Sequence, residues 1–185
     1  MATVGAEYVI STIQGDDAIH IVNQGGAVLG GLDPNGAVLG ASGAAAANVG
    51  SVGQIIRSTV ASGAAVALTT ATPANVTSIS VTAGDWDVWA AIDFNLAATT
   101  NLTQLIASMS LTSATLSTQP GGAGLGPDPN DQWSQAAAVN NGLIVLFPLT
   151  TLLVSAATTL YLVAQATFTV AGISAYGTLT ARRRR

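Results

Sequence analysis

The alternation of apolar and polar residues is clearest near the end of the chain. Two alternating segments flank a turn at Gly172: residues 160–170, and a second segment that continues to the C-terminus. In the first segment every even-numbered residue from Leu160 to Val170 is apolar, and most of the odd-numbered residues are polar. Alternation of this length predicts half-buried antiparallel strands. No catalytic type of side chain lies on these strands, which favours a packing module over an active-site scaffold.

The same period-2 pattern recurs from residue 54 onwards. Between Trp86 and Phe94 every second residue is apolar, and Asp85, Asp87 and Trp89 point to the opposite side. Further strands are expected at residues 56–60, 65–69, 75–82, 105–111, 143–147 and 152–155, with residues 114–118 pairing nearby. Short strands at this spacing predict an all-β fold, an antiparallel β-sandwich of jelly-roll type. The predicted core includes Trp86, Val88, Ile92, Phe94, Leu160, Leu162 and Phe168.

The first 53 residues differ in composition, because they are rich in turn-forming and small residues. The apolar runs 8–10 and 19–22 flank a turn-like Gly-Asp-Asp sequence, and Gly26-Ala-Val-Leu-Gly30 recurs at residues 36–40 after a strong turn sequence. This pattern predicts a hairpin or an extended arm that pairs with another chain, followed by a linker. We therefore divide the chain into an N-terminal attachment arm and linker, 1–53, and a β-sandwich display domain, 54–185. Candidate contact residues of the arm are Val28, Leu29, Val38 and Leu39.

The composition predicts that partner subunits cover part of the surface. Charged residues make up 8% of the chain and hydrophobic residues 49%, and there is no lysine. A soluble monomer usually has a surface that is about 25–35% charged. We therefore expect an oligomer, and the alternative is a neutral surface rich in Thr and Ser.

Charge and hydropathy exclude several classes of function. Nine acidic residues and one arginine give the first 181 residues a formal charge of −8, and the four terminal arginines add +4. An acidic body argues against nucleic-acid binding. The apolar run 143–153 is too short to span a bilayer and is interrupted by Pro148. With no secretory leader pattern at the N-terminus, we expect a protein that is made and assembled without export, and no membrane insertion.

The sequence offers little catalytic or metal-binding chemistry. His20 is the single histidine and there is no cysteine, which excludes catalytic triads and zinc sites. Asp85 and Asp87 would lie about 7 Å apart on one strand face, a separation that suits two glycosidase carboxylates. The simpler interpretation is a pair of solvent-facing acids. Likewise, Asp128-Pro-Asn-Asp131 could bind Ca²⁺, but a plain turn is favoured. We expect no enzyme activity, catalytic residue, cofactor or metal.

Three features remain as candidate interface residues. Trp89 lies on the acidic side of its strand, and an exposed Trp usually marks a subunit contact or a ligand platform. Trp133 lies in a Pro/Gly-rich loop, residues 119–133, of the length typical of functional loops. The tail, Arg182, Arg183, Arg184 and Arg185, could bind acidic surface on a neighbouring subunit or extend freely.

Two motifs resemble a domain that recurs in structural proteins of tailed bacteriophages. They are Thr77-Ser-Ile-Ser-Val-Thr-Ala-Gly-Asp-Trp-Asp-Val88 and the C-terminal pair Val163-Ala-Gln-Ala-Thr-Phe-Thr169 and Ala175-Tyr-Gly-Thr-Leu-Thr-Ala-Arg-Arg183. The resemblance covers residues 54–185, and the chain departs from it at Trp89, where a small residue is expected. It implies a trimeric β-sandwich joined to a variable attachment segment.

The resemblance leaves two hypotheses of different kinds. In the first, the protein is a homotrimeric capsid decoration or head-fibre protein, and residues 1–53 bind the major capsid protein or another virion protein. In the second, it is a tail-fibre or receptor-binding protein that recognises host surface glycan through Trp89, Trp133 and the 119–133 loop. Either way the expected location is the virion, assembled in the cytoplasm of a host bacterium.

Overall fold

The computed structural model describes the chain as two compact units, Met1–Ala47 and Asn48–Arg185. In the first unit it describes residue 47 and the strand backbones at 9–12, 19–22 and 28–32. In the second unit it describes residues 49–117 and 143–184.

The N-terminal unit contains a small antiparallel sheet. Its strands are β1 (Val9–Thr12), β2 (Ile19–Val22) and β3 (Val28–Leu32), paired in that order. The two predicted apolar runs become β1 and β2, with Ile10 opposite Ile21. Strand β3 contains Val28 and Leu29 from the first copy of the repeat and pairs with β2. Val38 and Leu39, from the second copy, lie outside the described residues.

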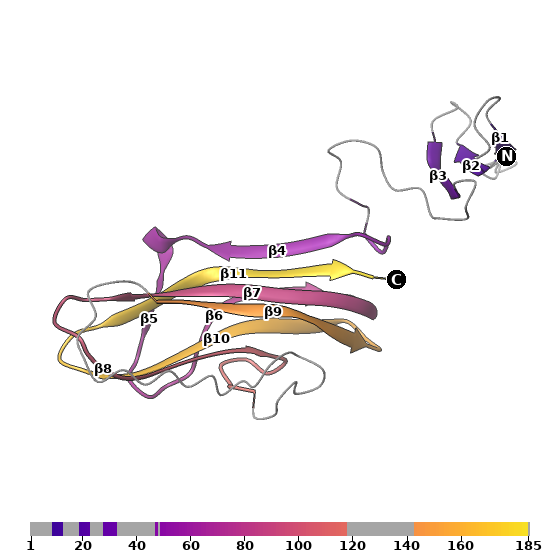
Figure 1. Cartoon of the computed structure of the whole chain (residues 1–185). Helices are drawn as coiled ribbons and strands as arrows, with labels where there is room; N and C mark the ends of the chain where they lie inside the picture. The colour runs from indigo at the N-terminus through magenta and orange to yellow at the C-terminus, as the bar shows by residue number, and fades with distance from the viewer. Residues whose placement is uncertain are drawn as a thin grey trace, which may run out of the picture. The chain divides into compact units, whose positions relative to one another are not determined.

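The second unit is a two-layered antiparallel β-sandwich, which confirms the predicted fold class (Figure 1). One layer is a five-stranded sheet with the order β4-β11-β7-β9, and β5 pairs with β11. Its strands are β4 (Ile55–Val60), β5 (Val66–Leu68), β7 (Gly84–Leu96), β9 (Leu143–Val154) and β11 (Ile173–Arg183). The other layer has the order β6-β10-β8, built from β6 (Ala74–Val81), β8 (Asn101–Ser110) and β10 (Thr158–Thr169). A short 3-10 helix, η1 (Ser62–Ala64), links β4 to β5.

The core lies between the two sheets, where the period-2 pattern placed it. Six of the seven predicted core residues are fully buried, and Phe168 is half-buried against the edge of the core. Trp86 is buried with its indole N–H donating a hydrogen bond to the Thr82 carbonyl oxygen at 3.0 Å. The bond satisfies the one polar atom that this large side chain brings into the core.

Three details of the predicted strands are wrong. Residues 143–154 form one strand, not two, because a bulge accommodates Pro148 in the middle of β9. The described residues of segment 114–118 form no strand. Val170 is 86% exposed instead of sharing the buried face of Leu160, because β10 ends at Thr169 and Val170 has a φ of 79°.

The C-terminal strand holds a central position. Strand β11 pairs along one edge with β7 and along the other with β4 and β5, whereas β10, its predecessor in sequence, belongs to the opposite sheet. At Gly177 the strand passes so close to β7 that a Cβ atom would collide with the Ala91 carbonyl oxygen and lie 2.9 Å from the Ile92 Cα atom. Glycine at this position is therefore a packing requirement.

Candidate functional site: the outer face of the five-stranded sheet

Trp89 lies on the outer face of the five-stranded sheet, as the alternation along β7 predicted. It is half-buried and sits opposite Thr180 of β11. On its other side the β7–β9 register shifts: Val88 pairs with Thr150 and Ala90 pairs with Phe147. Two residues of β9, Pro148 and Leu149, therefore lie opposite the single residue Trp89.

This bulge explains how a proline fits inside β9. Pro148 has no N–H to donate, so within sheets proline is confined to edge strands, strand starts and bulges. Among the described strands β9 lies at the edge of its sheet, and Pro148 lies at its bulge. The local break in pairing also leaves room around Trp89, because a bulge bends the strand that carries it.

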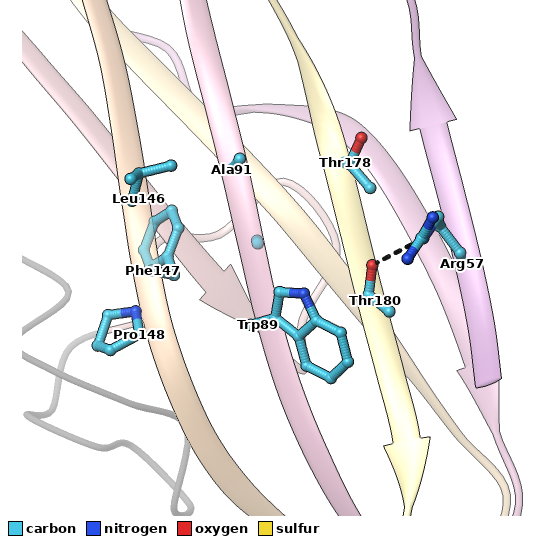
Figure 2. Close-up of a pocket in the computed structure, with 9 residues that line it drawn as sticks. Arg57, Trp89, Ala91, Leu146, Phe147, Pro148, Thr178 and Thr180 are labelled. Atoms are coloured by element: carbon cyan, nitrogen blue, oxygen red, sulfur yellow. Dashed lines mark hydrogen bonds between the residues drawn. The ribbon is translucent and has the colours of Figure 1, made fainter. Parts of the chain in front are cut away.

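A depression of about 500 Å³ surrounds Trp89 (Figure 2). Figure 2 shows the indole extending from β7 toward Thr180 on β11, with Arg57 beyond it on β4. The Arg57 Nε donates a hydrogen bond to Thr180 Oγ1 at 3.3 Å. The labelled lining residues are Arg57, Trp89, Ala91, Leu146, Phe147, Pro148, Thr178 and Thr180.

Arg57 is electrostatically distinctive. It is exposed, it is the single basic residue outside the C-terminal tail, and it forms no ion pair within the part of the chain that the structure describes. A guanidinium presents five N–H donors in a planar fork that matches a carboxylate. The depression therefore combines an aromatic face, two threonine hydroxyls and a cation that can take an anionic group.

Strand β9 adds an exposed apolar stripe to this face. Four apolar side chains of this strand are 56–73% exposed, while Leu152 and Val154 are buried. We call this set the β9 stripe: Ile144, Leu146, Leu149 and Leu153. Contiguous exposed apolar residues mark interaction surfaces on folded proteins. The sequence predicted strands at 143–147 and 152–155 but no exposed stripe, although apolar residues on both faces of a strand are a signal for one.

A second depression, of about 310 Å³, lies on the same sheet around Tyr176 and Asp93. The Tyr176 hydroxyl donates a hydrogen bond to Asp93 Oδ2 at 2.6 Å. This hydrogen bond, followed by burial and by the charge of Asp93, raises the pKa of Tyr176. The hydroxyl is thereby held in its protonated, donating form, which is the form that a carboxylate partner favours.

The acidic pair on β7 is not solvent-facing, so that prediction was wrong. Asp85 and Asp87 are buried, and arginines of the C-terminal tail bind them. Arg182 Nη2 lies 2.7 Å from Asp87 Oδ2, and Arg184 lies 3.4 Å from Asp87 Oδ1 and 3.9 Å from Asp85 Oδ1. Because Asp87 is bound by two arginines, Asp85 and Asp87 form a structural cluster with the tail. They are not arranged as the accessible acid and base of a glycosidase.

Arg183 is held in the same region by a different set of contacts. Its guanidinium lies over the Trp86 ring, 4.6 Å from the centroid, and donates to the Thr82 hydroxyl and to the Ala83 carbonyl oxygen. A guanidinium stacked on an indole gains a cation–π attraction in addition to its hydrogen bonds. Arg182, Arg183 and Arg184 therefore all have partners within their own chain, and a contact between these arginines and a neighbouring subunit stays a prediction.

Several predicted residues cannot be placed in a site. Trp133, Arg185 and the Asp128–Asp131 turn lie outside the described residues. The backbone of His20 belongs to β2, opposite Ser11 and Gly31. Among the described residues, no group of three or more His, Asp or Glu side chains is arranged to hold a metal ion. No helix in the described ranges is long and apolar enough to cross a membrane.

Comparisons with known proteins show no family for this chain. No family model and no curated protein matches the chain. A chain in a solved structure described as the structure of infectious bursal disease virus Gx strain is similar at 15% sequence identity, with a TM-score of 0.36. The alignment covers 95% of this chain and 42% of that one, so this chain spans less than half the viral chain's length. At that TM-score the likeness carries no argument about this chain.

Proposed function

We propose that this chain is a non-enzymatic structural protein of a bacteriophage virion, a homotrimeric decoration or head-fibre protein of the capsid. In this proposal residues 1–53 attach the protein to the major capsid protein or another virion protein, and the β-sandwich is displayed. The virion is assembled in the cytoplasm of the host bacterium.

One observation carries the proposal: the β9 stripe exposes four apolar side chains on the outer face of a sheet. Its four side chains are each more than half exposed, in a chain of which only 8% is charged. Burying a Leu or Ile side chain is worth about 1.5–3 kcal/mol. A protein with such a surface gains stability by assembly, which is the behaviour expected of a virion component.

The ionisable groups of the sandwich support a structural role. Asp85 and Asp87 bind arginines of the tail, and Asp93 accepts a hydrogen bond from Tyr176. Asp87 and Asp93 thereby join β7 to β11, and Asp85 binds the residue that follows β11. The assignment to phages rests on the resemblance of residues 54–185 to tailed-phage structural proteins.

The test is a particle-binding assay. Purified protein is added to phage particles that lack it, and bound protein is quantified after the particles are separated by sedimentation. We expect the full chain to bind at hundreds of copies per particle, and a variant that lacks residues 1–40 to remain folded but to lose binding. Full binding by residues 41–185 would contradict attachment through the arm.

A second candidate function is a tail-fibre or receptor-binding protein that recognises host surface glycan. The observation that favours it is the depression of about 500 Å³ in which Trp89, Arg57 and two threonine hydroxyls meet. An aromatic face with nearby hydrogen-bonding groups suits a sugar ring. Copy number separates the two candidates, because a fibre is present at tens of copies per virion or fewer.

A further inference from the structure

We propose that the depression around Trp89 binds a saccharide that carries a carboxylate, with the sugar ring on the indole of Trp89 and the carboxylate on the guanidinium of Arg57. The inference rests on the second candidate function, glycan recognition, and names the chemical class of the glycan. The site belongs to the β-sandwich and not to residues 1–53, so it is compatible with attachment of the protein through its arm.

The residues that define the site form one row across three adjacent strands. Thr180 of β11 lies opposite Arg57 of β4 on one side and opposite Trp89 of β7 on the other. Side chains directly opposite each other in antiparallel strands share one face of the sheet. Neighbouring strands are about 4.7–4.9 Å apart, so an aromatic and a cationic side chain that reach over β11 from its two sides lie close enough to contact one small ligand.

Trp89 provides the surface on which a sugar ring would rest. Figure 2 shows the indole face-on, extending over β11 toward Thr180. Thr180 is 1% exposed although it lies on the outer face of the sheet, because the side chains on either side of it lie over it. The half-buried indole therefore leaves part of its ring face accessible, and an aromatic face of this kind packs against the C–H groups of a sugar.

Arg57 is oriented before any ligand binds. Its Nε donates a hydrogen bond to Thr180 Oγ1 at 3.3 Å, and within the described ranges its guanidinium forms no ion pair. The two Nη groups of a guanidinium can bind both oxygens of one carboxylate. Because the hydrogen bond to Thr180 already restricts the side chain, less conformational entropy is lost when a carboxylate binds.

The next row along the strands supplies hydroxyl groups. Thr178 lies opposite Thr59 on β4 and opposite Ala91 on β7. The two threonine hydroxyls are 3.0 Å apart and share one hydrogen bond, and each has further capacity because a hydroxyl has one donor and two acceptor sites. Ala91 carries a small side chain and lines the depression, so it leaves space between the hydroxyls and the β9 strand. This combination matches the hydroxyls that surround a sugar ring.

The combined features favour a saccharide over other acidic ligands. The depression has a volume of about 500 Å³, within the range of about 300–1,000 Å³ that is usual for small-molecule sites. A nucleic acid would bring many phosphates close to a body whose first 181 residues carry nine acids and one arginine. An acidic peptide would use Arg57 but has no need of the indole.

The experiment is isothermal titration calorimetry on the full chain with two carboxylated probes, trigalacturonate and sialyllactose, which separate uronic acids from sialic acids. Each probe is paired with its methyl ester, which keeps the sugar rings and removes the charge. We expect at least one acid to bind, and its methyl ester to bind about 10- to 100-fold more weakly, the effect of losing a hydrogen-bonded charge pair.

Variants assign the two halves of the contact. Arg57→Gln should weaken binding of the acid to the level of its methyl ester and leave the ester unaffected. Trp89→Ala should abolish binding of both, and Trp89→Phe should retain part of it. The matched control is Arg184→Gln, which removes the same charge from a side chain that is 47% exposed and does not line the depression, and should leave binding unchanged. Thermal melting confirms that each variant is folded.

Three results would overturn the inference. The first is no binding of either acid at millimolar concentration. The second is equal binding of acid and methyl ester that depends on Trp89 and not on Arg57, which refutes the acidic class and leaves glycan recognition standing. The third is binding of oligoglutamate that Arg57→Gln abolishes and Trp89→Ala does not, which would make the depression a contact for acidic peptides. Particle binding by the same variants is measured in parallel, because attachment through residues 1–53 should not change with them.

Discussion

Arg182 on β11 lies directly opposite Asp87 on β7, and the two side chains meet at 2.7 Å between Nη2 and Oδ2. Beyond this pair the backbone N–H of Arg184 donates to the Asp85 carbonyl oxygen at 2.8 Å. The arginines at the end of the chain therefore extend the backbone pairing of β11 with β7 one residue past the end of β11, to Arg184. They close the end of β7 and shield its two acidic side chains from solvent.

The Asp87–Arg182 pair should contribute measurably to stability. Asp87→Asn leaves the shape of the side chain but removes the charge that two arginines share, and we expect a loss of about 1.5–3 kcal/mol, the range for hydrogen bonds to charged groups. Chemical denaturation of Asp87→Asn, Arg182→Gln and the double variant gives the coupling energy, expected to be about 1 kcal/mol. Arg184→Gln is the matched comparison and should have a smaller effect, because its contacts are 3.4 and 3.9 Å long. Additive effects of the Asp87 and Arg182 changes would contradict a direct pair.

Gly177→Ala should destabilise the sandwich because β11 and β7 approach each other too closely for a side chain at this position. The new methyl group would meet backbone atoms of Ala91 and Ile92, which cannot move without disturbing β7. We expect a loss of about 1–3 kcal/mol or more, typical of overpacking. Gly63→Ala is the control, since a Cβ there meets nothing within 4 Å. Equal melting temperatures for the two variants would refute the close approach.

Phe94→Ala should cost about 3–5 kcal/mol, the range for removing a fully buried aromatic side chain. Phe94 has no exposed surface and lies in the core that β7 shares with the opposite sheet. Leu153→Ala, at a site 73% exposed on β9, should change the free energy of unfolding by less than about 0.5 kcal/mol in the monomer. Urea denaturation at low protein concentration makes the comparison, and similar midpoints would place Phe94 outside the core.

The Tyr176–Asp93 hydrogen bond predicts a loss of stability at high pH. The pKa of Tyr176 is raised in the folded state above its ordinary value of 10.0. A raised pKa means that the stabilisation is fully present below pH 10 and is lost as pH rises through the folded-state pKa. The difference in unfolding free energy between the unmodified chain and Tyr176→Phe should therefore shrink above pH 10.

The control for this prediction is Asp93→Asn, which removes the charge and should bring the pKa of Tyr176 back toward its ordinary value. The pKa is measured by ultraviolet titration of the tyrosines. A stability difference between the unmodified chain and Tyr176→Phe that stays constant from pH 8 to pH 12 would contradict the hydrogen bond.

The sequence by itself determined the fold class and most of the core. Alternation along residues 86–94 and 160–166 predicts which side chains face inward, and this prediction does not depend on which strands are neighbours. Trp89 was placed on the outer face of the sheet for the same reason. A period of two needs no knowledge of pairing partners, because it follows from the pleat of a single strand.

Only the tertiary structure decided what lies beside these faces. The burial of Asp85 and Asp87 depends on a register that brings Arg182 opposite Asp87, across 95 residues of sequence. The meeting of Arg57 with Thr180 depends likewise on β11 lying between β4 and β7. Hydrophobic alternation is the same for every order of strands in a sheet, so it carries no information about which strands are adjacent. The order and register of the strands arise from the packing of the whole sandwich, and they place the residues of the candidate site beside one another.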